Sequence, residues 1–194
     1  MIRGYSGLKP IRNRAISALL ISDSLLLSAA AMLAPIYALF VDKVGGDILA
    51  AGVTAAALAF GSGIASLVSG RAIDGMRNKR SLLVGSCMVM ALGFLGYALA
   101  GSVIVLALVQ VVMGIARAVH ATAFDALYTV HLDKGREGEE WGAWEALFYF
   151  SEAGGALAGS LIVTATSFRM LFVVMSALTF FGGLYLFRLP KRLL

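Results

Sequence analysis

Four ionisable side chains interrupt long apolar segments of this sequence: Asp23, Arg117, His120 and Glu152. A carboxylate can take up a proton, an imidazole can exchange one near neutral pH, and a guanidinium can hold an anionic group. Counting positions along the apolar segments places these groups at similar depth on the first, fourth and fifth of them. We therefore expect a substrate or proton pathway. The alternatives are a static ion pair between Arg117 and Glu152 and a hydrogen-bonded, structural His120.

The segments that carry these groups are predicted membrane spans. Of 194 residues, 60% are apolar and 14% are charged, and the mean hydropathy is +0.88. Soluble domains carry about 25% charged residues, so this composition excludes an ordinary soluble enzyme, a disordered chain and a coiled coil. A span needs about 20 apolar residues. This rule predicts an all-α membrane protein, one six-helix domain over residues 1–194, with spans near 15–41, 48–70, 82–100, 103–127, 144–168 and 170–187.

The basic residues predict how the spans are oriented. Thirteen of the 16 Lys and Arg residues fall in the two tails and in the second and fourth connections. Only Lys43 and Arg169 fall on the other side, and Arg117 lies within a span. This bias places both termini in the cytoplasm and indicates a multi-pass protein of a prokaryotic inner membrane. Because topology accounts for the net charge of +5, we expect the lipid bilayer and no nucleic acid as a partner.

The sequence contains no H-E-x-x-H, G-x-S-x-G, P-loop or G-x-G-x-x-G motif. The two histidines, His120 and His131, are a poor metal pair, and the single Cys87 excludes a Cys-based zinc site. We therefore expect no catalytic residues, no metal, no cofactor and no enzymatic activity.

The connection between the second and third spans reads GRAIDGMRNKRSLL and begins at Gly70. It resembles motif A of the major facilitator superfamily, in which a Gly and an Asp precede a basic cluster. We expect a gating loop that latches one conformation, with Asp125 as a partner for Arg77 or Lys79. The alternative is a set of orienting charges with a helix-capping Asp. The candidate gating residues are Gly70, Asp74, Arg77, Lys79, Arg80 and Asp125.

The fifth span contains AGGALAGS, which resembles the glycine-rich motif C of antiporters in the same family. Gly155 and Gly159 have the spacing that lets helix backbones approach closely, so we predict helix packing, with a gating hinge as the alternative. Pro35 is expected to kink the first span. The uncharged third and sixth spans suit contact with lipid. The resemblance likewise implies that these two helices lie outermost while the first and fourth line a cavity. Trp141 and Trp144 are interpreted as interfacial anchors.

Six spans are half of the twelve that the family resemblance implies. We expect a half-size secondary transporter that works as a parallel homodimer by alternating access. The motifs favour efflux or antiport of a small organic molecule, driven by protons through Asp23 or Glu152. Two alternatives stay open. The chain pairs with a different six-helix protein or forms the N-terminal half of a longer transporter, or it is a membrane scaffold that transports nothing.

Overall fold

The computed structural model describes residues 13–76, 78–190 and 192–194. Within these ranges every regular element is a helix, and six helices are long and apolar enough to cross a membrane. The predicted fold class and number of spans are therefore confirmed. The first span consists of α1 (Arg14–Leu33), the 3₁₀ turn η1 (Ala34–Ile36) and α2 (Tyr37–Lys43). The others are α3 (Ile48–Asp74), α4 (Lys79–Leu99), α5 (Val103–His131), α6 (Glu137–Ala165) and α7 (Phe168–Arg188).

The first span changes from α-helical to 3₁₀ geometry at Pro35, the second residue of η1. Proline has no backbone N–H and its ring clashes with the preceding turn, so a regular helix cannot run through it. The expected kink therefore lies at Pro35. It separates α1 from the short helix α2, whose Tyr37 side chain forms hydrogen bonds with residues of α3 and α5.

Polar side chains mark where the helices begin. At five helix starts the residue before the helix accepts a hydrogen bond from a backbone N–H of the first turn. These capping residues are Asn13, Asp47, Asn78, Ser102 and Ser167. Each cap satisfies a donor that the helix itself leaves unpaired, which matters where little water is present.

Several helices extend further than the apolar segments alone predict, and α3 and α6 show the physical reasons. Helix α3 continues to Asp74, so Gly70 and Asp74 lie in a helix and not in the connecting loop that we expected. Helix α6 starts at Glu137, and Glu137, Glu139 and Glu140 occupy its first turn. Acidic residues at this end stabilise a helix through its dipole, so polar residues can extend a helix past the apolar stretch.

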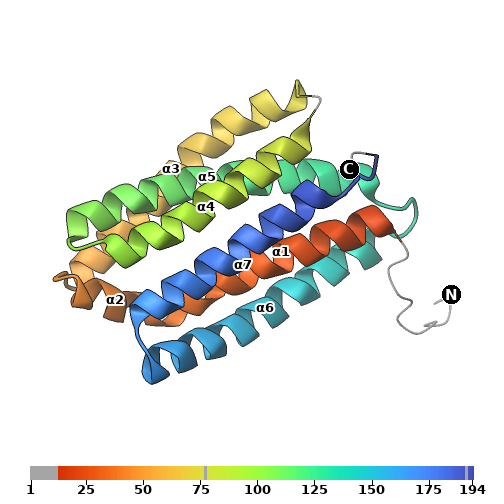
Figure 1. Cartoon of the computed structure of the whole chain (residues 1–194). Coiled ribbons are helices and arrows are strands. Elements are labelled where there is room, and N and C mark those ends of the chain that lie inside the picture. The colour runs from red at the N-terminus through yellow and green to blue at the C-terminus, as the bar shows by residue number, and fades with distance from the viewer. Residues whose placement is uncertain (1–12, 77, 191) are drawn as a thin grey trace, which may run out of the picture.

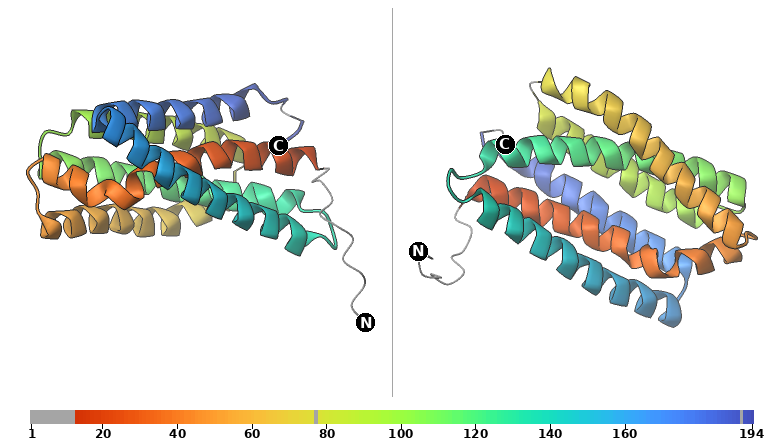
Figure 2. Two further views of the ribbon diagram at one scale, coloured as in Figure 1. Left: turned by 90° about the horizontal axis from the view of Figure 1, so that it is seen from below. Right: turned by 180° about the vertical axis from the view of Figure 1, so that it is seen from behind.

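The helices lie side by side along one axis, and α1 begins at the same end of the bundle at which α7 ends (Figure 1). We call this the terminal end, and the opposite one the far end. Helix α3 packs mainly on α5, α1 on α6 and α7, and α4 on α5 and α7. Figure 2 shows the same order from two further sides. The first three spans correspond in order to the last three, so α1 corresponds to α5, α3 to α6 and α4 to α7. Under this correspondence the α1–α6 contact is equivalent to the α5–α3 contact. In both contacts a helix of the first half of the chain packs against a helix of the second half, which we call the exchanged pairing.

Glycines occupy both of these exchanged contacts. A Cβ at Gly155 would lie 2.6 Å from the carbonyl oxygen of Ser28, and one at Gly159 would overlap the carbonyl of Met32 on α1. In the α3–α5 contact, a Cβ at Gly61 would lie 2.8 Å from the carbonyl oxygen of Val111. Because no side chains separate the backbones at these glycines, α1 approaches α6 closely, and α3 approaches α5 closely.

Helices α4 and α7 present one buried and one exposed face. Inner residues such as Phe94, Tyr97 and Phe172 belong to the main apolar core. Outer residues such as Leu92 and Phe181 are exposed and apolar. The apolar outer faces suit contact with lipid, and the inner faces support α1 and α5. The expectation that α4 and α7 lie outermost is not supported by burial, because α3 and α6 are less buried than α4 and α7.

Candidate functional site

A cavity of about 430 Å³ separates α1 from α5. Residues of α1, α5 and α6 form its sides, and Met90, Phe94 and Met175 of α4 and α7 also line it. Helices α1 and α5 make few direct contacts along this stretch, because α1 leans on α6 and α7 while α5 leans on α3 and α4. The cavity is therefore a consequence of how the helices pair. Its volume falls in the range of about 300–1,000 Å³ that is usual for small-molecule sites.

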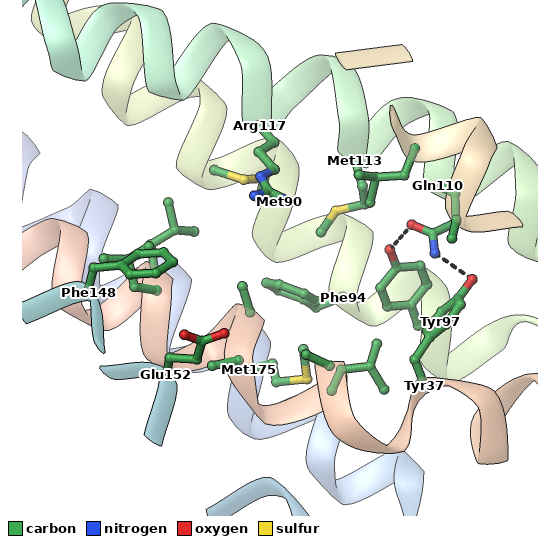
Figure 3. Close-up of a pocket in the computed structure, with 18 residues that line it drawn as sticks. Tyr37, Met90, Phe94, Tyr97, Gln110, Met113, Arg117, Phe148, Glu152 and Met175 are labelled. Carbon is green, nitrogen blue, oxygen red and sulfur yellow. Dashed lines mark hydrogen bonds between the residues drawn. The ribbon is translucent and has the colours of Figure 1, made fainter. Parts of the chain in front are cut away.

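Arg117 and Glu152 both line this cavity, from α5 and α6 respectively. Figure 3 shows the two side chains on opposite walls, each directed toward the space between them. Both residues are exposed, and within the described part of the chain neither forms an ion pair or a hydrogen bond. The static Arg117–Glu152 pair that we considered is therefore not found. Two opposite charges face a mainly apolar cavity without being neutralised by one another.

Asp23 and His120 lie outside the lining of the cavity and are buried, with 5% and 4% of their surface exposed. Nε2 of His120 lies 3.2 Å from Oδ1 of Asp23. The other ring nitrogen, Nδ1, lies 3.2 Å from the hydroxyl of Ser86 and 3.7 Å from the sulfur of Cys87. The sequence placed all four ionisable groups in one layer. The structure instead divides them into an open pair in the cavity and a buried pair nearer the terminal end.

Trp144 completes the buried pair. Its indole Nε1 donates a hydrogen bond to Oδ2 of Asp23 at 2.8 Å, so both oxygens of this carboxylate have a polar partner. The interpretation of Trp144 as an interfacial anchor is therefore incomplete, because its polar atom reaches into the bundle. The cluster Asp23–His120–Trp144 joins α1, α5 and α6 on the terminal side of the cavity. We call it the Asp23 cluster.

A second set of hydrogen bonds lies on the far side of the cavity. The hydroxyl of Tyr97 donates to Oε1 of Gln110 at 2.8 Å, and Nε2 of Gln110 donates to the hydroxyl of Tyr37 at 2.6 Å. Tyr37 in turn donates to the hydroxyl of Thr54 at 2.6 Å. We call these four residues the Tyr37 cluster, and Figure 3 shows three of them at one end of the cavity.

The Tyr37 cluster joins α2, α3, α4 and α5, so it ties the kinked first span to the opposite half of the bundle. Sequence reasoning missed it as a candidate site. The available signal was Gln110, a polar residue in an uncharged part of the fourth span, together with tyrosines in two other spans. The cavity thus lies between two polar clusters, one toward each end of the bundle.

An aromatic column runs from the Asp23 cluster in both directions. Toward the terminal end, Trp144 packs near Phe124 and Trp141, with ring centroids 6.2 Å and 5.8 Å away. In the other direction, the Trp144 and Phe148 ring centroids are 5.9 Å apart, and Phe148 lines the cavity. The column therefore extends from the cavity wall toward the terminal end.

The motif-A-like residues occupy the terminal end of α3 and α4. Asp74 is exposed in the last position of α3, and no Cβ contact within 4 Å restricts Gly70. Nη2 of Arg80 donates to the carbonyls of Phe187 and Leu189, both at 2.7 Å. Arg80 thereby caps the end of α7, which has unpaired carbonyl groups and a partial negative charge.

Asp125 is exposed on α5 and forms no ion pair with Lys79 among the residues that the structure places. The other expected partner, Arg77, lies outside the described residues. The latch between Asp125 and the basic cluster is therefore absent for Lys79 in this conformation. Arg80 instead connects this region to the end of α7 by hydrogen bonds.

Across residues 13–76, 78–190 and 192–194 no group of three or more His, Cys, Asp or Glu side chains could hold a metal ion. In a comparison with family models, one described as Major Facilitator Superfamily matches residues 19–193. No curated protein matches the chain.

Proposed function

Because the chain belongs to the major facilitator superfamily, whose members are membrane transporters, we propose that it is a half-size secondary transporter. In this proposal two parallel copies form one functional unit, and the substrate is a small organic molecule. The family supports transport, and the open cavity supports a small-molecule site. Motifs A and C favour efflux or antiport, and the bias of Lys and Arg favours cytoplasmic termini in a prokaryotic inner membrane.

The unpaired charges on the cavity carry the proposal of a homodimer. Arg117 and Glu152 are exposed near the middle of two apolar spans, α5 and α6. Each charge would cost about 2.5–3.5 kcal/mol near the bilayer centre on insertion scales, so lipid is a poor cover for this face. Protein or a water-filled cavity must cover it. A second copy in the same orientation, related by a two-fold axis along the membrane normal, supplies both.

Alternating access requires that each end of the shared cavity can close. The Tyr37 cluster lies on the far side and the Asp23 cluster on the terminal side, so each end has a set of polar contacts that can break and re-form. In our proposal a rocking motion of one copy against the other opens one end while closing the other. Asp23 and Glu152 are the candidate proton carriers, because each is a carboxylate within a span.

The first experiment is the subunit count of the purified protein in nanodiscs, by mass photometry and native mass spectrometry. A dimer is the expected result. A stable monomer would contradict the homodimer and would direct the search to another six-helix partner or to a scaffold role. Both results are read without knowledge of the substrate.

The second experiment is a flux assay in liposomes that hold a pH-sensitive dye, to which a panel of small organic compounds is added. Wild-type protein is expected to move protons with at least one compound, and Glu152→Gln to abolish this while remaining assembled. The control is Glu145→Gln, a charge removal on the same helix at a residue outside the cavity lining. Loss of assembly by Glu152→Gln alone would show that Glu152 has a structural role instead.

A further inference from the structure

The two charges on the cavity have opposite sign and come from different walls. Arg117 extends from α5 and Glu152 from α6, and each is directed into the same space without forming an ion pair with the other (Figure 3). Asp23 and His120, by contrast, already have partners within the chain. Each copy of the chain therefore contributes one free cationic and one free anionic group to the cavity.

The rest of the cavity offers little further polar binding. Toward the far end, Tyr37, Tyr97 and Gln110 use their polar atoms on each other and on Thr54. Arg117 follows Gln110 by seven positions on α5, which separates their backbones by about 10 Å along the helix. The wall between these two levels is apolar and is formed by residues such as Leu26, Met90, Phe94, Met113 and Met175. Methionine and phenylalanine side chains suit apolar groups of varied shape.

Charge complementarity selects among four kinds of ligand. A neutral apolar molecule would exclude water from both charges and pair neither. An anion would pair with Arg117 but would place a like charge near Glu152, and a cation would do the reverse. A molecule with both charges pairs with both side chains, and buried charges are stable only when they are paired.

We infer that the substrate is a small zwitterion with an apolar body, an inference that rests on the proposed transport function. Arg117 holds its carboxylate, Glu152 holds its ammonium group, and Phe94, Phe148 and the methionines contact its body. A guanidinium is well suited to the carboxylate because it can donate two parallel hydrogen bonds. The chemical class is that of an apolar or aromatic amino acid.

The test uses three compounds with the same phenyl body: L-phenylalanine, phenethylamine, which lacks the carboxylate, and 3-phenylpropanoate, which lacks the ammonium group. Their affinities are measured by isothermal titration calorimetry on the full chain in nanodiscs. Wild-type protein is expected to bind L-phenylalanine at least about tenfold more tightly than the other two. Arg117→Gln should weaken L-phenylalanine binding at least about tenfold, whereas phenethylamine should bind no more weakly than to the wild type, because the variant removes the like charge that opposes it. Glu152→Gln should weaken L-phenylalanine binding equally, whereas 3-phenylpropanoate should bind no more weakly than to the wild type, for the same reason.

Glu145→Gln is the matched control and should leave all three affinities unchanged. Equal affinity for the three compounds, tighter binding of a singly charged one, or no binding of L-phenylalanine would each overturn the inference. Retained helical content and an unchanged elution volume establish that each variant is folded. The subunit count separates this inference from the proposed function. A monomer that prefers L-phenylalanine, and loses this preference in both charge variants, supports the ligand class and contradicts the homodimer. A dimer without this preference contradicts only the ligand class.

Discussion

The indole of Trp144 donates a hydrogen bond to the carboxylate of Asp23 at 2.8 Å, although 121 positions separate the two residues in the sequence. The bond connects the first span with the fifth on the terminal side of the cavity. With His120 on the other oxygen, Asp23 is bound from two helices at once.

Replacing Trp144 by Phe should destabilise the folded protein more than the same change at Trp141. Both changes replace an indole by a smaller phenyl ring, but only Trp144→Phe removes the donor to a buried carboxylate oxygen. An unsatisfied buried group costs about 1–3 kcal/mol. The free energy of unfolding in mixed micelles, measured by titration with SDS, checks this. An equal decrease in the free energy of unfolding for the two variants would show that the indole N–H of Trp144 does not contribute to stability.

Asp23 and His120 should show energetic coupling in a double-mutant cycle. Asp23→Asn and His120→Gln each remove a charge-bearing partner, so the second change should cost less once the first is present. We expect an interaction energy of about 0.5–3 kcal/mol. The control cycle combines Asp23→Asn with Gln110→Leu in the Tyr37 cluster, and its effects should add to within about 0.5 kcal/mol. Additive effects in both cycles would contradict an energetic coupling between Asp23 and His120.

Gly159→Ala should loosen the contact between α1 and α6. The new Cβ would overlap the carbonyl of Met32, whereas the same change at Gly154 on the same helix meets no atom within 4 Å. We expect Gly159→Ala to lower the free energy of unfolding by about 1–3 kcal/mol, as overpacking does elsewhere. Gly154→Ala should change it by no more than about 0.5 kcal/mol. Equal free energies of unfolding for the two variants would show that α1 and α6 can move apart without loss of stability.

The orientation can be read from single cysteines, because Cys87 is the one cysteine in the sequence. In a Cys87→Ser background, Lys43→Cys lies in the last turn of α2 and Lys134→Cys in the connection between α5 and α6. With cytoplasmic termini, a membrane-impermeant maleimide added to intact cells should label Lys43→Cys alone. Lys134→Cys should react only after permeabilisation. The reverse pattern would invert the proposed topology.

The sequence was sufficient for the six helices and for the identity of the ionisable residues within them. The length of an apolar segment and the presence of a charge within it are properties of that segment alone, so both can be determined from the sequence. Depth along the helix, however, says nothing about direction around it. Arg117 and His120 are three residues apart at nearly the same depth, yet Arg117 lines the cavity and His120 contacts Asp23. Which way each side chain points depends on how α5 packs against α3 and α4.

Trp144 illustrates the other limit of the sequence. A tryptophan near the end of an apolar segment is typical of the membrane interface, and nothing local indicates that its N–H finds a carboxylate on the first span. The Tyr37 cluster is similar, because its four members come from four different helices. Contacts of this kind follow from the kink at Pro35 and from the exchanged pairing of the helices, which no single segment specifies.

The exchanged pairing also has a consequence for how the protein is made. Asp23 leaves the ribosome 97 positions before His120 and 121 positions before Trp144, the residues that bind its carboxylate. Likewise, Ser28 and Met32 are synthesised well before Gly155 and Gly159, which their backbones contact. Gly61 is synthesised before α5, on which it packs. The first three spans therefore enter the bilayer before any of their main partners among the last three have been synthesised. A nascent chain at this stage carries an unpaired acidic group in its first span. Until the fifth span has been inserted, the apolar residues of the first span alone must keep it in the bilayer.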